Sequence, residues 1–134
     1  RKELEPVDHS TVTYAPFRKN FFVESAEMRM MAEVEVAKVR ESLELRVHGK
    51  KCPRPISRWT QAGLANNILK SLERHGYTAP FPIQCQALPA LMAGRDVIGI
   101  AKTGSGKTVA YALPMLRHAL DQPPLAGADS VLLL

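Results

Sequence analysis

The 134-residue sequence predicts an α/β fold whose parallel sheet begins late in the chain, after an irregular and partly helical N-terminal stretch. Two short apolar runs, "DVIGIA" at 96–101 and "SVLLL" at 130–134, are typical of buried strands. A helical pattern separates them, and the order strand, helix, strand produces parallel pairing. Because one such unit cannot cover both faces of its sheet, and because residue 1 is Arg, we expect the chain to be a piece of a longer one.

Residues 1–57 are predicted to form an N-terminal extension. The first 27 residues carry prolines, charges and aromatic side chains without a period, which predicts extended structure packed on a surface. The aromatic residues expected to make that contact are Phe17, Phe21 and Phe22. Residues 28–45 lack glycine and proline and repeat apolar positions every three or four residues, so they predict one helix.

Three further helices are predicted, at 64–75, 82–93 and 106–122. The first has an apolar face that recurs at helical spacing, and Gly76 is placed to end it. The second begins with Pro82 and ends before Gly94. Pro114 is expected to bend the third.

Charge is distributed unevenly along the chain. The net charge is +5, yet no carboxylate occurs between Glu44 and Glu73. The cations in that window are Arg46, Lys50, Lys51, Arg54, Arg58 and Lys70. Such a patch attracts phosphate backbones or acidic partners, or it is a solvated basic linker.

The composition excludes several classes of protein. Apolar residues make up 46% of the chain, which argues against bulk disorder or a fibrous protein. No apolar run approaches the length of a membrane span, so no membrane association is expected. The two cysteines, Cys52 and Cys85, predict free thiols in a reducing compartment.

Residues 101–108, "AKTGSGKT", lie between the first predicted strand and the last predicted helix. That context predicts a phosphate-binding loop. Gly104 and Gly106 allow the backbone to curl so that its N–H groups face phosphate oxygens, and the helix N-terminus adds partial positive charge. Lys107 would reach the β- and γ-phosphates, and the Thr108 hydroxyl would hold magnesium.

The predicted phosphate-binding residues are Ala101, Lys102, Thr103, Gly104, Ser105, Gly106, Lys107 and Thr108. The pattern departs from G-x-x-x-x-G-K-[ST] at its first position, which is Ala101. A tight strand-to-helix turn with an exposed lysine is the alternative interpretation.

A second group of residues could recognise a base. Gln84 carries one donor and one acceptor in the geometry that matches an adenine edge, and Pro80 and Pro82 stiffen the backbone beside it. Trp59 and Tyr77 could stack on the base. Taken by themselves, a glutamine on a helix is usually solvated, and the two aromatic rings would more often pack in a core.

Together the two groups resemble the DEAD-box ATP-dependent RNA helicases. "GYTAPFPIQ" at 76–84 is similar to that family's Q motif, with Trp59 at the place of its upstream aromatic residue. "AKTGSGKT" is similar to the family's phosphate loop, whose leading alanine accounts for Ala101. Phe81 stands where the family usually has a threonine. This chain therefore lacks the hydroxyl that the threonine would place near the phosphate loop.

The segments "KELEPVDHS", "YAPFRKNF" and "CPRPISRW" resemble the region before the helicase core in one subfamily. Its members are pre-mRNA-processing helicases that act with the branch-site-recognising ribonucleoprotein. The resemblance implies a nuclear protein whose partners are RNA and a spliceosomal ribonucleoprotein.

The resemblance also implies an incomplete first RecA-like domain at 87–134, after a Q-motif segment at 58–86 and the extension at 1–57. ATP and magnesium would be the cofactors, with Gln84 on adenine and Trp59 and Tyr77 beside it. No "DEAD" or "SAT" sequence occurs in the chain, so we expect these residues alone to lack helicase and ATPase activity.

Two other functions stay open. The chain could belong to another phosphate-loop enzyme, such as a DNA helicase or a small-molecule kinase. It could also be a non-catalytic module whose basic extension docks RNA or a spliceosomal protein.

Overall fold

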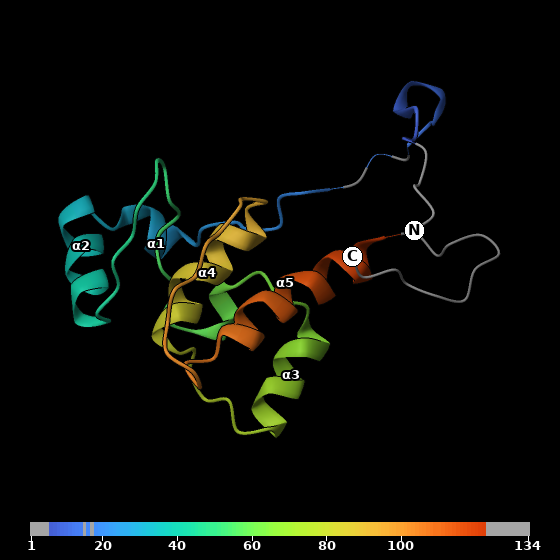
Figure 1. The fold of residues 1–134 in the computed structure, drawn as a ribbon. Coiled ribbons are helices and arrows are strands. Elements are labelled where there is room, and N and C mark those ends of the chain that lie inside the picture. Colours follow the sequence, from blue (N-terminus) through green and yellow to red (C-terminus); the bar gives the residue numbers. More distant parts are fainter. Residues whose placement is uncertain (1–5, 15, 17, 123–134) are drawn as a thin grey trace.

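The computed structural model describes residues 6–14, 16 and 18–122, and the regular elements within these ranges are helical (Figure 1). The helices are α1 (Ala26–Met30), α2 (Glu33–Ser42), α3 (Asn66–Arg74), α4 (Pro82–Met92) and α5 (Lys107–Asp121), with short 3-10 turns at His9–Thr11 and Trp59–Gln61. No helix in this part of the chain is both long and apolar enough to cross a membrane.

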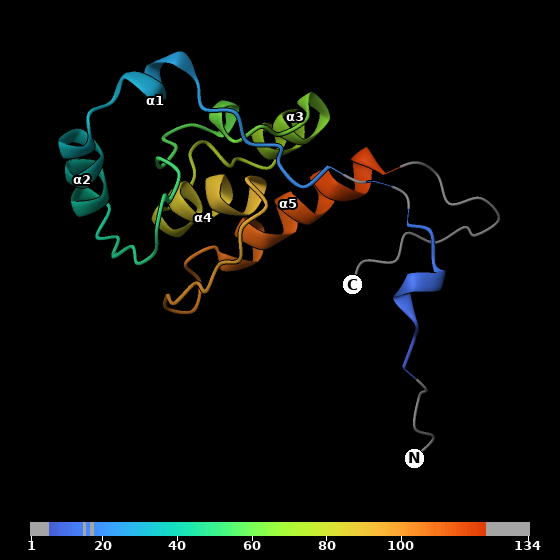
Figure 2. The same ribbon diagram turned by 90° about the horizontal axis from the view of Figure 1, so that it is seen from above.

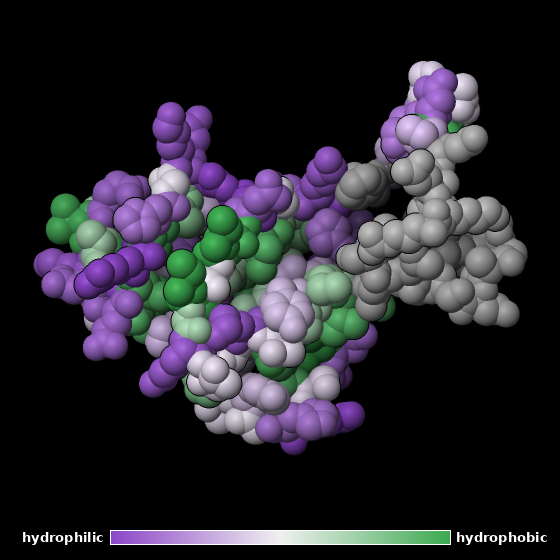
Figure 3. All heavy atoms as spheres, viewed as in Figure 1, coloured by the Kyte–Doolittle hydropathy of each residue, from purple (hydrophilic) through white to green (hydrophobic). Residues whose placement is uncertain are grey.

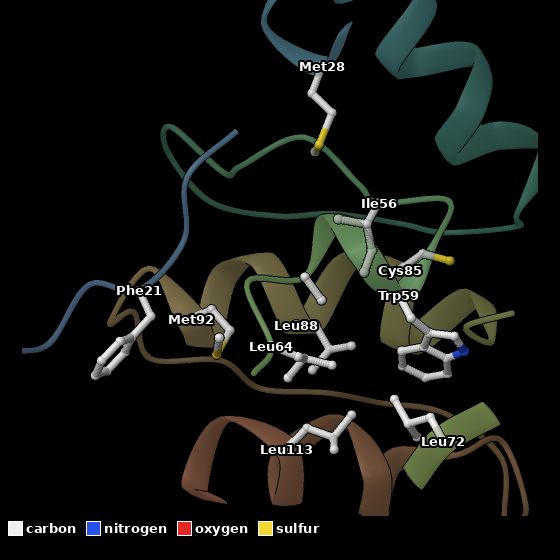
Figure 4. Packing of buried hydrophobic residues seen from close by; sticks show 11 residues of the cluster. Phe21, Met28, Ile56, Trp59, Leu64, Leu72, Cys85, Leu88, Met92 and Leu113 are labelled. Carbon is white, nitrogen blue, oxygen red and sulfur yellow. The ribbon is translucent and has the colours of Figure 1, made fainter. Parts of the chain in front are cut away.

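Helix α4 lies at the centre of the fold. Its residues are apolar around most of the helix, and nearly all of them are buried, which is typical of a helix covered on several sides. It packs along α5. Figure 4 shows Leu88 and Met92 of α4 pointing into a cluster that Leu64 and Leu113 close from the other side.

Three predicted helices are confirmed. Those predicted at 64–75, 82–93 and 106–122 are α3, α4 and α5, with ends that differ by one or two residues. Pro114 lies inside α5, and the bend expected there stays a prediction.

The prediction of a single helix at 28–45 is wrong, because the structure has two helices separated at Met31 and Ala32. The Ser25 hydroxyl accepts a hydrogen bond from the Met28 N–H at 3.2 Å and caps the start of α1. Glu35 then accepts from the Ala32 N–H at 2.8 Å and caps the start of α2. A second cap inside the window restarts the chain as a new helix, which apolar periodicity alone did not reveal.

The strand predicted at 96–101 is also absent: this segment has no regular secondary structure and belongs to no sheet of the described residues. Ile98 and Ile100 are 93% and 92% exposed, and hydrophobic atoms gather over the region between α4 and α5 in Figure 3. A strand is defined by hydrogen bonds to a neighbouring strand, and no segment of the described chain pairs with this one. The second predicted strand, 130–134, lies outside the described residues.

The N-terminal extension runs across the end of α4 (Figure 2). The backbone N–H groups of Phe21 and Phe22 both donate to the Met92 carbonyl, at 2.6 and 3.1 Å. The Phe21 ring is buried, meets the edge of His118 at a centroid distance of 4.6 Å, and has the Arg117 guanidinium over its face. Phe21 is therefore part of the core, while Phe17 lies outside the described residues.

Part of the basic stretch pairs with acidic residues of the extension. Arg54 contacts Glu24 at 3.0 Å and Glu33 at 3.6 Å, and Arg58 contacts Glu27 at 2.7 Å. The Arg54 pair with Glu24 is about three-quarters buried, whereas the Arg58 pair is exposed. These two arginines are consequently occupied within the fold.

Replacing Phe21 with alanine is expected to destabilise the whole chain. A buried phenylalanine that is truncated leaves a cavity and costs about 3–5 kcal/mol, and the matched control Val23→Ala, at a position that is 77% exposed, should stay within about 0.5 kcal/mol. Urea unfolding of both variants measures the difference. Equal losses, or a Phe21→Ala variant as stable as the parent, would mean that the extension is not part of the core.

Candidate nucleotide-binding site

The loop at 101–106 curls immediately before α5. Gly104 and Gly106 adopt positive φ angles of 79° and 87°, a backbone region that favours glycine. Gly106 is the residue that caps the N-terminus of α5. The first N–H groups of a helix have no partner within it, so the start of α5 offers donors and partial positive charge on the side of this loop.

Lys107 points back into the loop. Its ammonium donates hydrogen bonds to the carbonyls of Ala101 and Lys102, the second at 2.7 Å. Ser105 carries a buried hydroxyl that has no partner in the described chain. Lys102, Thr103 and Thr108 are exposed. An inward cation beside an unpartnered hydroxyl fits an anion such as a phosphate.

Gln84 connects the start of α4 to the start of α5. Its side-chain oxygen accepts from the Phe81 N–H at 2.8 Å, and its side-chain nitrogen donates to the Gly106 carbonyl at 3.0 Å. The residue is 1% exposed. The predicted base-reading residue is therefore fixed against the predicted phosphate loop, and each atom of its amide keeps one hydrogen-bonding position in reserve.

Phe81 and Gly106 lie in close contact. A Cβ atom on Gly106 would lie 2.4 Å from the Gln84 side-chain nitrogen and 2.7 Å from the Phe81 ring. The sequence marked Phe81 only as a departure from the Q-motif pattern. In the structure its ring, half exposed, covers the side of the phosphate loop, which no feature of the local sequence predicts.

Trp59 and Tyr77 lie together but apart from Gln84. They line an open cavity of about 580 Å³ with residues of α3, and neither Gln84 nor the phosphate loop contributes to its wall. Trp59 is 7% exposed and its indole nitrogen is buried without a partner in the described chain, whereas Tyr77 is 40% exposed. The three residues predicted to recognise a base therefore lie in two places: Trp59 and Tyr77 line the cavity beside α3, and Gln84 lies between the starts of α4 and α5.

A polar contact of α4 that the sequence did not predict involves Gln86. The Gln86 side chain, although 7% exposed, donates to the Pro53 carbonyl at 2.9 Å and accepts from Arg40 at 2.9 Å. Its nitrogen also lies 3.3 Å from the Cys52 sulfur. Only the polar character of Gln86 in an otherwise apolar helix could have indicated this contact. Beside it, burial raises the pKa of the Cys85 thiol.

Residues 81–134 match the DEAD/DEAH box helicase family. Over 98% of its length the chain is 55% identical to the probable ATP-dependent RNA helicase DDX46 of Danio rerio, and over 96% it is 57% identical to the human protein of that name. It is 54% identical over 96% of its length to DEAD-box ATP-dependent RNA helicase 45 of Oryza sativa.

The chain belongs to the DEAD-box helicase family. It spans about 13% of the length of these curated relatives. Two solved helicase structures resemble it. The RNA helicase Prp28 from Chaetomium thermophilum bound to ADP has a TM-score of 0.67 and 35% identity, covering 73% of this chain and 24% of that one.

The yeast DEAD-box splicing factor Prp28 gives a TM-score of 0.68 at 26% identity, covering 81% of this chain and 24% of that one. These likenesses confirm the predicted fold class, since the helices of this DEAD-box chain match part of a RecA-like helicase domain. The described residues contain no paired strands. The match to a RecA-like domain nevertheless supports the predicted fold class.

The contact between Gln84 and Gly106 can be tested with two glycine variants. Gly106→Ala forces the buried Gln84 amide off its carbonyl, because the new Cβ would overlap it, and an unpaired buried donor costs about 1–3 kcal/mol. Gly104→Ala is the matched control: it has the same sign of φ, but nothing lies within 4 Å of its Cβ position. We expect Gly106→Ala to lower the free energy of unfolding by clearly more than Gly104→Ala. Similar losses would show that positive φ alone is what matters at both positions.

Proposed function

We propose that this chain supplies the Q motif and phosphate loop of an ATP-dependent RNA helicase, and that the intact protein couples ATP hydrolysis to remodelling of RNA or ribonucleoprotein. The observation that carries the proposal is the hydrogen bond from Gln84 to Gly106 at 3.0 Å. It connects two motifs that lie 22 residues apart in the sequence. Membership of the DEAD-box family supports the class of reaction.

The phosphates of ATP would lie against the start of α5. Backbone N–H groups at 104–108 and the Lys107 ammonium would face them, with Lys107 exchanging its present carbonyl partners for phosphate oxygens. The Thr108 hydroxyl would be a ligand of magnesium, which offsets phosphate charge when it is bound with ATP. The exposed position of Thr108 in the first turn of α5 is compatible with that role.

Adenine would be recognised by Gln84, whose amide has one donor and one acceptor position left. Trp59 and Tyr77 would contribute aromatic surface beside the base. Because Gln84 is 1% exposed in this structure, the base would need to approach along the edge of the Phe81 ring. That arrangement makes Gln84 both a reader of the base and a support of the phosphate loop.

The proposal extends to pre-mRNA splicing in the nucleus, with RNA and a spliceosomal ribonucleoprotein as partners. Two facts support it: the similarity to the yeast splicing factor Prp28 over 81% of the chain, and the resemblance of the N-terminal segments to the pre-mRNA-processing subfamily.

The 134-residue chain is expected to bind ATP only weakly and not to hydrolyse it. Hydrolysis needs a positioned water and compensation of charge on the γ-phosphate. After Glu73 the described carboxylates are Asp96, which precedes the segment leading to the loop, and Asp121, which pairs with Arg18 at 2.9 Å at the far end of α5. Asp129 lies outside the described residues.

Nucleotide binding and phosphate release are measured in parallel on the chain and on its Lys107→Ala variant. Loss of ATP binding in the variant, with no phosphate release from either protein, is the expected result. RNA-stimulated phosphate release that disappears in Lys107→Ala would contradict the expectation that the chain is inactive. Unchanged ATP affinity in that variant would contradict the phosphate-loop assignment.

Gln84→Ala is expected to weaken ATP binding by roughly 1–3 kcal/mol more than GTP binding, because a bidentate contact to an adenine edge is worth that much. Loss of the contact to Gly106 would weaken both nucleotides alike, so the difference between them measures base recognition. Calorimetric titration with each nucleotide provides the two affinities. Equal losses would restrict Gln84 to its structural role.

A further inference from the structure

We propose that residues 44–51, here called the basic loop, form a binding surface for the phosphate backbone of single-stranded RNA, separate from the nucleotide site. The inference builds on the proposed RNA-dependent function and adds a second place of contact on the extension. It rests on how the structure divides the basic stretch seen in the sequence.

Only part of that stretch is available to a partner. Arg54 and Arg58 are already paired with glutamates of the extension. Arg46, Lys50 and Lys51 are exposed, and no carboxylate in the described chain forms an ion pair with any of them. Apart from Lys70, which lies on α3, the cations that remain are therefore gathered within six consecutive residues.

The backbone of the first half of the basic loop exposes Arg46 and partly buries its apolar neighbours. From Leu45 to His48 burial alternates, with Leu45 and Val47 half-buried and Arg46 and His48 exposed, which is the period of an extended segment. The apolar residues of the loop face inward, so its outer side offers charge and little apolar surface. Figure 3 shows hydrophilic side chains at the tip of the loop that follows α2. A protein-docking surface would need a buried apolar anchor, whereas phosphate contacts need charge and hydrogen-bond donors.

The tip of the basic loop is held in place. The Arg95 guanidinium, just after α4, donates to the backbone carbonyls of both Lys50 and Lys51. Lys51 itself has a positive φ of 52°, uncommon for a residue with a side chain. Backbone strain of this kind persists where surrounding contacts enforce it. Arg95 thus holds the backbone of two consecutive exposed lysines.

The base of the loop is also fixed. Gln86 of α4 accepts from Arg40 of α2 and donates to the Pro53 carbonyl, so both ends of the loop are joined to the same helix. Helix α2 lies at the edge of the molecule in Figures 1 and 2, and the loop leads from it back towards α4. Because folding already orders the loop, RNA binding would not lose its conformational entropy again, and the strand would meet a preorganised surface.

The test compares two triple variants of the 134-residue chain, each losing three exposed cations. Arg46→Gln/Lys50→Gln/Lys51→Gln removes the charge of the basic loop. Arg29→Gln/Arg58→Gln/Arg74→Gln is the matched control, with the same change in net charge elsewhere and with Arg58 taken from the same stretch of sequence. Binding of single-stranded oligouridine is measured without nucleotide between about 50 and 200 mM salt.

The loop variant is expected to lose affinity and to reduce the slope of log affinity against log salt by about 2 units, since three phosphate contacts on single-stranded RNA contribute about 0.7 each. The control should keep most of the slope. Equal changes in both variants would overturn the proposal, because net charge would then explain the binding. Binding to polyglutamate with no binding to oligouridine would also overturn it and assign the surface to an acidic protein.

A third variant, Arg95→Lys, tests the positioning. It keeps the charge but loses the two-pronged contact to the loop carbonyls, so RNA affinity should fall while the thermal unfolding midpoint and the affinity for ATP stay close to those of the parent. Unchanged RNA affinity would contradict the role given to Arg95. Since oligouridine binding is measured without nucleotide, failure of ATP binding would leave this result intact and would instead count against the proposed function.

Discussion

The amide of Gln84 determines how the parts of this chain relate to one another. It is buried between the first turn of α4 and the first turn of α5, and it has a hydrogen bond to each. Moving the two helix N-termini apart would leave the buried Gln84 amide without its Gly106 partner, at a cost of about 1–3 kcal/mol. The phosphate loop, which ends at Gly106, is consequently positioned by the Q motif rather than by its own sequence alone.

Helix α4 extends this constraint through the rest of the molecule. One end carries Gln84, its middle carries the Gln86 contact to α2 and Pro53, and its last turn offers the Met92 carbonyl to the extension. Most of the helix is therefore covered, by the phosphate loop, α5 and the N-terminal extension. In physical terms the extension belongs to the core, since it contributes Phe21, Met28 and Ile56 to one hydrophobic cluster with Leu88.

This arrangement separates two kinds of positive charge. Arg54 joins two parts of the extension and Arg58 connects it to the following segment, while Lys107 lies in the loop of the candidate nucleotide site. The cations of the basic loop have neither role in these contacts, and the tip of that loop is held just after the C-terminal end of α4, whereas the phosphate loop contacts its N-terminal end. An RNA contact there would leave the ATP site unobstructed, which is compatible with a helicase that binds both ligands at once.

The sequence by itself determined the class of fold, three helices with ends correct to within one or two residues, and the motifs that place the chain in the DEAD-box family. These features are local: periodic apolar residues, a proline at a helix start, and glycines where φ must be positive. What only the tertiary structure decided depends on partners distant in sequence. The break between α1 and α2 needs side-chain caps, the strand at 96–101 needs a neighbour that the described residues do not provide, and the separation of Trp59 and Tyr77 from Gln84 depends on how α3 and α4 pack. The availability of each arginine likewise depends on which glutamate lies opposite, because an ion pair is set by distance in space and the sequence records only order along the chain.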